Sequence, residues 1–373
     1  MKHLDEYRAP ELCRGIAAAI AATAERLERP ATIMEVCGTH TMAIARHGIR
    51  GLLPDAVRLI SGPGCPVCVT PNAYLDHAIA LARRPDTTIV TFGDMLRVPG
   101  SRSSLELERA RGADVRVVFS PLETLAHADR AAEREFIFLG IGFETTAPTV
   151  AALVLAAAER GTPNVSVLAA PKTMPPPMRL LAGDPAVGVD GYICPAHVST
   201  IIGTALYEEI ARDFGIPCVV AGFEPVDILR SIHLLVERIA DRRPGVDIEY
   251  ARVARPEGNR KALAAMARVF EPVDAEWRGL GVIPGSGLAI RVEFAQWDAA
   301  RRFPVTLPPP REHRGCRCGD VLRGAFAPEH CPLFGRACTP ERPVGPCMVS
   351  TEGTCAAAYR YGQVRGETVA SGE

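Results

Sequence analysis

Short runs of β-branched and apolar residues alternate with helix-length amphipathic segments through the first two thirds of the chain, and this alternation constrains the fold most. A strand, a helix and a further strand form a βαβ unit, which requires a parallel sheet with right-handed crossovers. Eight strands are expected, in two sets of four. They cover residues 31–36, 57–60, 87–92, 114–119, 135–140, 164–168, 190–193 and 216–220.

The chain is therefore expected to be an α/β protein with two similar parallel-sheet βαβ domains, over residues 31–130 and 131–242. The rhythm fails after about residue 242, and a proline run at 308–310 leads into a cysteine-rich segment. Residues 243–373 are expected to form a loop-rich third domain, together with a helical N-terminal segment of residues 1–30.

Six cysteines lie between residues 316 and 355, and four of them follow the spacing C-x14-C-x6-C-x16-C. Proline and glycine interrupt the loops between them, so four thiolates can reach one point, where they bind an iron–sulfur cluster or a structural zinc ion. Zinc has no use for the other two cysteines, whereas an electron-carrying cluster can use a neighbouring dithiol. The expected ligands are Cys316, Cys331, Cys338 and Cys355, and the expected redox relay is Cys318 and Cys347.

A second group of cysteines lies near the ends of the first two expected strands. Cys65-Pro-Val-Cys68 is a C-x-x-C sequence, which can close a short disulfide and often lowers the pKa of its first thiol. Half of a zinc site is the alternative, but the sequence holds no second C-x-x-C to complete it. Cys37 follows the first strand; helix amides after it would favour its thiolate. His40 could hydrogen-bond that sulfur or relay a proton, although a purely structural histidine is commoner.

The unusual motifs all follow expected strands. Ligands of open parallel sheets bind beyond the carboxyl ends of the strands, so two such edges facing each other would form one cleft. Cys194-Pro-Ala-His197 follows one strand and Gly142-Phe-Glu-Thr-Thr-Ala-Pro148 another. The second motif lacks the lysine and glycine spacing of a phosphate loop. Its threonines suit a helix N-cap, and Glu144 is its functional candidate.

Composition excludes some classes of partner. The net charge of −1 gives no electrostatic footprint for nucleic acid or an anionic membrane. The N-terminal segment lacks the apolar core of a secretory signal, so a cytoplasmic protein is expected. In a reducing compartment, the 12 cysteines are better explained as metal ligands or redox thiols than as structural disulfides.

Together, the motif Cys37-Gly-Thr-His40, the motif Gly-Pro-Gly-Cys65-Pro-Val-Cys68, the Gly142–Pro148 motif and the C-terminal cysteine spacing resemble the hydrogenase formation protein HypD family. The resemblance runs from about residue 4 to residue 361. It implies two α/β domains and a third domain that carries a [4Fe-4S] cluster on Cys316, Cys331, Cys338 and Cys355.

The resemblance also implies a function, which is to help build the Fe(CN)2CO group of nickel–iron hydrogenases. A HypC-like chaperone would share an Fe(II) ion that acquires its CN and CO ligands, and a HypE-like partner would donate cyanide. Cys37 would be an iron ligand, with Cys65 and Cys68 as a redox-active or ligating pair. Such a protein is an assembly scaffold with redox activity rather than a conventional turnover enzyme.

Two other interpretations use the same residues. An iron–sulfur thiol–disulfide oxidoreductase acting on a protein partner needs the cluster and the thiols but not Cys37. A zinc-stabilised nucleotide-binding module needs neither electrons nor iron, and the absence of a phosphate loop counts against it.

Overall fold

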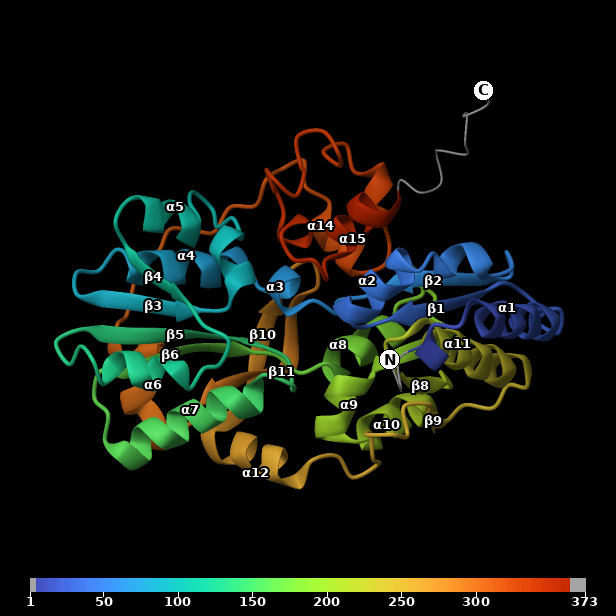
Figure 1. The fold of residues 1–373 in the computed structure, drawn as a ribbon, viewed down its shortest axis with the longest axis horizontal. Helices are drawn as coiled ribbons and strands as arrows, with labels where there is room; N and C mark the ends of the chain where they lie inside the picture. Colours follow the sequence, from blue (N-terminus) through green and yellow to red (C-terminus); the bar gives the residue numbers. More distant parts are fainter. Residues whose placement is uncertain (1–4, 363–373) are drawn as a thin grey trace.

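The computed structural model describes residues 5–362. Figure 1 shows two lobes, each built on a parallel sheet, with the cysteine-rich C-terminal region above their junction. An α/β protein with parallel βαβ units was predicted, and this is confirmed. Between Asp5 and Gly362, no helix has both the length and the apolar character needed to cross a bilayer.

Sheet A has five parallel strands in the order β2-β1-β7-β8-β9. Register is set by pairs such as Ile33 with Leu59 and Ile33 with Gly191. The strands are β1 (Ala31–Glu35), β2 (Val57–Ser61), β7 (Gly191–Pro195), β8 (Cys218–Ala221) and β9 (Val246–Ile248).

Sheet B has four parallel strands in the order β4-β3-β5-β6. Its strand β5 (Glu135–Gly142) is buried along almost its whole length, which suits an apolar strand covered on both faces. The others are β3 (Thr87–Thr91), β4 (Asp114–Val117) and β6 (Val165–Pro171).

The predicted strand positions hold to within three residues at either end, but the expected division of the strands between the sheets is wrong. Residues 31–130 do not form one sheet and residues 131–242 another, because β1 and β2 pair with β7 and β8 while β3 and β4 pair with β5 and β6. The chain therefore crosses from sheet A to sheet B after β2 and returns after β6. A repeat period indicates that a strand follows a helix, but not which sheet that strand joins.

Fifteen α-helices and six 3-10 turns lie within the described residues. The α-helices are α1 (Pro10–Ala24), α2 (Gly38–Arg46), α3 (Pro66–Val69), α4 (Asn72–Ala82), α5 (Leu105–Ala110), α6 (Glu123–Ala128), α7 (Ala147–Arg160), α8 (Pro175–Ala182), α9 (Ala196–Ile202), α10 (Ala205–Phe214), α11 (Pro225–Ala240), α12 (Arg260–Val269), α13 (Ala299–Arg302), α14 (Cys318–Leu322) and α15 (Thr354–Tyr361). The 3-10 turns are η1 (Asp5–Tyr7), η2 (Ile49–Leu52), η3 (Gly93–Arg97), η4 (Val292–Trp297), η5 (Pro328–His330) and η6 (Pro346–Met348).

Helix α1 packs against α11 of the sheet A lobe. Its buried side chains Cys13, Ala17, Ile20 and Ala24 are spaced four, three and four residues apart, which puts them on one helix face. The N-terminal helix was expected to belong with the C-terminal domain, and that expectation is wrong. The apolar residues of α11 and the buried face of α1 belong to one core of the sheet A lobe.

An antiparallel hairpin, β10 (Phe270–Trp277) and β11 (Gly281–Ile290), connects the lobes and was not predicted. Four of the eight residues of β10 and four of the ten residues of β11 are exposed, and both strands contain a proline, so they lack a strand-like apolar alternation. The hairpin tip reaches the centre of the molecule, where a shared apolar core joins both sheets and the cysteine-rich region. That core includes Met34, Cys68, Phe143, Trp277 and Cys347.

Candidate functional site

Cys37 occupies the N-cap position of α2, directly beyond β1. Its backbone N–H donates to Glu35 Oε2 at 3.2 Å, and its Sγ lies 3.5 Å from His197 Nε2 at the start of α9. Burial, reinforced by the negative charge of Glu352, raises the pKa of the Cys37 thiol to about 12. The backbone N–H groups of His40 and Thr39 favour the thiolate, as expected, but burial outweighs them. The resting sulfur is therefore a protonated thiol.

The ring of His40 lies in the same cluster, but it bonds to the backbone of Gly222 and not to the Cys37 sulfur. Its Nε2 contacts the carbonyl oxygen of Gly222 at 2.9 Å, and its ring packs on Phe223, as does the ring of His197. Burial lowers the pKa of His40 to about 4, so its ring is neutral at pH 7. A neutral ring that donates from Nε2 leaves a free lone pair on Nδ1, and this atom is buried without a partner. The hydrogen bond expected of His40 is made by His197 instead.

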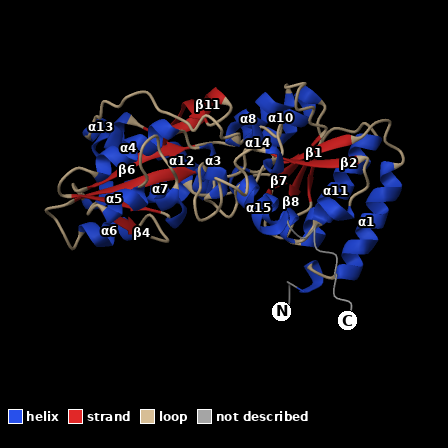
Figure 2. Cartoon of the chain, turned by 90° about the horizontal axis from the view of Figure 1, so that it is seen from above, coloured by secondary structure: helices blue, strands red, loops and turns tan. Residues whose placement is uncertain are grey.

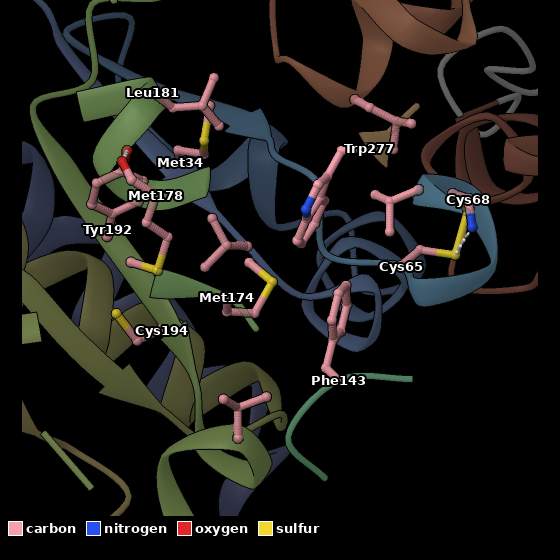
Figure 3. Close-up of a cluster of buried hydrophobic side chains, with 14 of the residues drawn as sticks. Met34, Cys65, Cys68, Phe143, Met174, Met178, Leu181, Tyr192, Cys194 and Trp277 are labelled. Carbon is pink, nitrogen blue, oxygen red and sulfur yellow. Dashed lines mark hydrogen bonds between the residues drawn. A yellow bond between two sulfur atoms is a disulfide. The ribbon is translucent and has the colours of Figure 1, made fainter. Parts of the chain in front are cut away.

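The C-x-x-C sequence forms a disulfide between Cys65 and Cys68, with the two Cα atoms 5.2 Å apart. Both residues are buried in the central core, and Figure 3 shows the disulfide beside Trp277 and Phe143. Cys65 caps the short helix α3, which lies between the two sheets in Figure 2. The loop before Cys65 touches the Cys37 loop, since Gly38 N–H donates to Gly64 O at 3.0 Å.

One cavity is lined by all six C-terminal cysteines. Cys318 Sγ and Cys347 Sγ are 2.7 Å apart, so the two thiols can reach each other without movement of the backbone. Shared hydrogen bonds with Cys316 and Cys347, helped by the positive charge of Arg278, hold the pKa of the Cys318 thiol well below its usual range. The hydrogen bond between Cys318 and Cys347 also raises the pKa of the Cys347 thiol.

The donor set of this cavity fits an iron–sulfur cluster. In residues 5–362, no three His, Cys, Asp or Glu side chains converge closely enough for a single metal ion. A cluster separates its cysteine ligands more widely, because irons and sulfides lie between them. Gly345 leaves space for one expected ligand, since a Cβ there would lie 2.7 Å from Cys316 Sγ. Cys316, Cys331, Cys338 and Cys355 are therefore suitable ligands, and their chemistry is soft-thiolate binding.

The helix that carries Cys68 packs against the segments that carry two of the cavity cysteines. Cys68 Sγ is 3.9 Å from the carbonyl oxygen of Pro346, the residue before Cys347. Helix α3 also contacts both α14, which begins at Cys318, and η6, which contains Cys347. The structure thus brings together the three sets of cysteines that the sequence singled out: the cavity set, the Cys65/Cys68 pair and Cys37.

Glu144 is buried at the end of β5. Its Oε1 accepts from Met174 N–H at 2.9 Å, whereas Oε2 is buried without a partner. Burial raises the pKa of Glu144 to about 7, so this carboxyl group exchanges a proton near neutral pH. Glu144 follows a strand of sheet B, whereas Cys37 follows a strand of sheet A.

A cleft lies between the two sheet edges. It is lined by residues that follow β2 and β3, by the end of β5 and the segment after it, and by two residues of the cysteine-rich region. The lining residues include Val67, Asp94, Thr146, Ser350 and Glu352. The predicted site residues Cys37, His40, Cys65, Cys68 and Glu144 do not line the cleft.

Sequence reasoning missed the contact role of three residues. His197 stood in a motif that followed a strand, so its place was signalled but its contact with Cys37 was not. Glu352 accepts from Thr39 Oγ1 at 2.6 Å across 313 residues, and no local pattern indicates it. Arg278 lies in the unpredicted hairpin.

Comparison with known proteins gives close relatives over the whole length. The family model HypD, described as "Hydrogenase formation hypA family", matches residues 11–362. The hydrogenase maturation factor HypD of Rhizobium leguminosarum bv. viciae is 46% identical, over 98% of this chain and 97% of the relative. That of Rhodobacter capsulatus is 46% identical over 98% and 99%, and that of Escherichia coli strain K12 is 43% identical over 98% and 100%.

Proposed function

The chain belongs to the HypD family of hydrogenase maturation factors, and from this premise we propose that it holds iron while the Fe(CN)2CO group of nickel–iron hydrogenase is assembled. A HypC-like chaperone would share the iron, and a HypE-like protein would donate cyanide. The observation that supports this proposal most is the placement of Cys37 beside His197, at the edge of sheet A and next to the C-x-x-C loop.

Cys37 and His197 are the proposed protein ligands of the iron substrate. A thiolate and an imidazole nitrogen suit an iron that carries soft diatomic ligands. Iron binding would displace the proton of the Cys37 thiol, whose pKa of about 12 keeps it protonated beforehand. Both residues lie at strand ends of sheet A, so further ligands from a chaperone can complete the coordination.

Cys65 and Cys68 are proposed to supply the electrons that release cyanide from a thiocyanate. Two electrons break the sulfur–carbon bond of the donor, which leaves a thiol on the donor and cyanide for the iron. The two Cys thiols supply these electrons and two protons, and they become the disulfide seen here. One proton goes to the donor sulfur and the other is released. Glu144, with its pKa of about 7, is the candidate proton carrier.

Cys318 and Cys347 are proposed to regenerate the Cys65/Cys68 dithiol. The cluster on Cys316, Cys331, Cys338 and Cys355 would supply single electrons that originate from a low-potential one-electron carrier. Two such electrons and two protons reopen the disulfide. The 2.7 Å sulfur separation of the relay pair and the contact of Cys68 with Pro346 support this route. The logic resembles that of ferredoxin:thioredoxin reductase, by analogy only.

The alternative function is an iron–sulfur thiol–disulfide oxidoreductase that acts on a protein partner. Both functions require a partner to gain access to the Cys65/Cys68 pair, because Cys65 is 3% exposed and Cys68 is 0% exposed. The two functions differ in Cys37, which the oxidoreductase does not need.

Replacement of Cys37 separates the two functions. Cys37→Ala should abolish iron binding outside the cluster and the infrared bands of bound CO and cyanide in the anaerobically purified complex with a HypC-like chaperone. The visible absorption of the cluster should remain. Cys13→Ala, which removes a buried cysteine from α1, is the matched control and should keep the bands. Undiminished bands in Cys37→Ala would contradict the scaffold function and favour the oxidoreductase.

A further inference from the structure

Arg278, at the tip of the β10–β11 hairpin, is a charged side chain that is only 5% exposed. Its backbone N–H donates to Val69 O at 2.9 Å, and Nη2 donates to Thr70 O at 2.8 Å and to Asn72 Oδ1 at 2.7 Å. Val69 is the last residue of α3, the helix that carries Cys68. Arg278 therefore fixes a positive charge at the carboxyl end of that helix.

The same hairpin tip lies against the relay pair. A Cβ on Gly279 would come within 2.3 Å of the Cα of Gly319, which follows Cys318. Only glycine permits so close an approach between these two backbones. Arg278 thus lies between the disulfide of Cys65 and Cys68 on one side and α14 with Cys318 on the other.

The charge of Arg278 is only weakly neutralised by its surroundings. Within residues 5–362 its carboxylate partner is Glu312, whose side chain is 57% exposed. Water screens that partner, whereas the guanidinium, 4% exposed, lies in the interior. In addition, Nε is buried without a hydrogen-bond partner. A buried donor without an acceptor costs stability, which suggests that an acceptor is present in the functional protein.

We propose that Arg278 raises the reduction potential of the cluster in the cysteine cavity, because its fixed positive charge stabilises the more negative, reduced state of that cluster. This inference rests on the proposed function, because it assumes a cluster in the cysteine cavity. Arg278 acts through the cluster and touches no substrate, so it is a positioning residue.

The physical reason is electrostatic. An electron that enters the cavity makes it one unit more negative without breaking a bond, and a fixed positive charge in a low-dielectric region favours that state. Hydrogen bonds and charge near the sulfurs are established determinants of cluster potentials. Loss of the guanidinium should therefore make reduction harder.

The test is a potentiometric titration of the anaerobic, cluster-loaded protein. Dithionite is the one-electron reductant, and electron paramagnetic resonance of the reduced cluster is the readout. Arg278→Gln should lower the equilibrium constant for reduction about tenfold, which is about 59 mV for a one-electron couple. Arg278→Lys keeps the positive charge but loses the planar guanidinium group, so it should shift the reduction potential by less than Arg278→Gln does. The matched control is Arg317→Gln, since Arg317 also lines the cavity but is 49% exposed and paired with Asp320.

A second titration examines the disulfide. In dithiothreitol redox buffers, two electrons and two protons open Cys65–Cys68 to thiols, and dithiothreitol closes its own disulfide. Alkylation and mass spectrometry then give the reduced fraction. Because two protons accompany the two electrons, the charge of the pair does not change. The equilibrium constant for opening the disulfide should therefore be the same in Arg278→Gln as in the wild type, and the disulfide serves as an internal control for the cluster titration.

Glu312→Gln keeps the packing of Arg278 and removes its water-screened counter-charge. It should therefore shift the cluster potential upward, by less than the downward shift expected of Arg278→Gln, and it provides a test even if Arg278→Gln does not fold. A cluster potential unchanged in Arg278→Gln, or unchanged in Glu312→Gln where the first variant is unfolded, would overturn the proposal. A shift in Arg278→Gln no larger than in Arg317→Gln would do the same. If the wild-type protein has no reducible cluster, the proposed function fails; a reducible cluster with unaltered potentials defeats only the role of Arg278.

Discussion

Cys37 Sγ lies 3.5 Å from His197 Nε2, although 160 residues separate the two in sequence. They meet because β1 and β7 are neighbours in sheet A and both residues follow the carboxyl ends of these strands. Strand order therefore creates a sulfur–nitrogen pair that neither local motif contains.

His197→Ala should weaken iron retention by about tenfold or more, because losing a ligand or its partner typically costs at least that much in affinity. The measurement is iron content in excess of the cluster after gel filtration with a HypC-like chaperone. His233→Ala, in α11 and away from Cys37, is the control and should retain iron. Equal retention in both variants would exclude His197 as a ligand.

Glu352→Gln should make Cys37 more reactive toward iodoacetamide. The carboxylate raises the pKa of this thiol, so its removal increases the thiolate fraction at pH 8, by up to about tenfold for one pKa unit. Alkylation of the Cys37 peptide, followed by mass spectrometry, gives the rate. In both proteins the rate should keep rising with pH through the accessible range, because the wild-type pKa is about 12.

Glu329→Gln, an exposed change in the same region, should leave the rate of Cys37 alkylation unaltered. A rate in Glu352→Gln equal to that of this control would show that the carboxylate does not influence the sulfur.

Cys347→Ser should break the relay and leave the cluster in place. Dithionite-reduced wild-type protein should convert Cys65–Cys68 to thiols, whereas the variant should retain the disulfide, because one member of the 2.7 Å pair is missing. Visible absorption reports the cluster, and differential alkylation reports the disulfide. Cys13→Ser should behave as wild type. Normal reduction in Cys347→Ser would mean that electrons reach Cys68 by another path.

Glu144→Gln should remove a pH-dependent cost to stability. The unfolded carboxyl ionises near its ordinary pKa of 4.5 and the folded one near 7, so between these values the folded protein binds more protons. Stability consequently falls as pH rises through this window, by about 3 kcal/mol. Glutamine keeps an oxygen for Met174 N–H.

In anaerobic thermal unfolding, Glu144→Gln should therefore have a higher melting temperature than the wild type at pH 8 and the same melting temperature near pH 4.5. Glu159→Gln, exposed on α7, should show no such divergence. A constant difference between Glu144→Gln and wild type across this range would contradict the raised pKa.

Local patterns predicted the strands well because an apolar run such as 135–140 can only be stable when buried on both faces. The sheet to which each strand belongs could not be predicted, because a crossover of similar length can return to either sheet. Long-range contacts explain the other omissions. Glu352 contacts Thr39 across 313 residues of sequence, so no local pattern indicates this pair. The hairpin strands are partly exposed and contain prolines, so they show no apolar alternation that would have revealed the hairpin and Arg278.

The cysteine spacing was informative because it depends on chemistry rather than on burial. All six cysteines line one cavity, and the pair left over from the expected ligand set is the pair in contact. The expected thiolate character of Cys37, by contrast, depended on an environment that the sequence does not encode locally. Helix amides are present and lower the pKa of Cys37, but its burial by α2, α9 and the Glu352 segment raises that pKa by more.

The segment from Ser350 to Glu352 connects the cysteine-rich region to both lobes. Ser350 Oγ donates to Asp94 in the sheet B lobe at 2.7 Å, and Glu352 accepts from Thr39 beside Cys37 in the sheet A lobe. Both residues lie between Cys347 and Cys355, two of the cysteines that line the cavity. With the proposed cluster bound, this loop segment would gain part of its order from the metal. Loss of the cluster would then also loosen the enclosure of Cys37, so the state of one sulfur site would be communicated to the other through a single short stretch of chain.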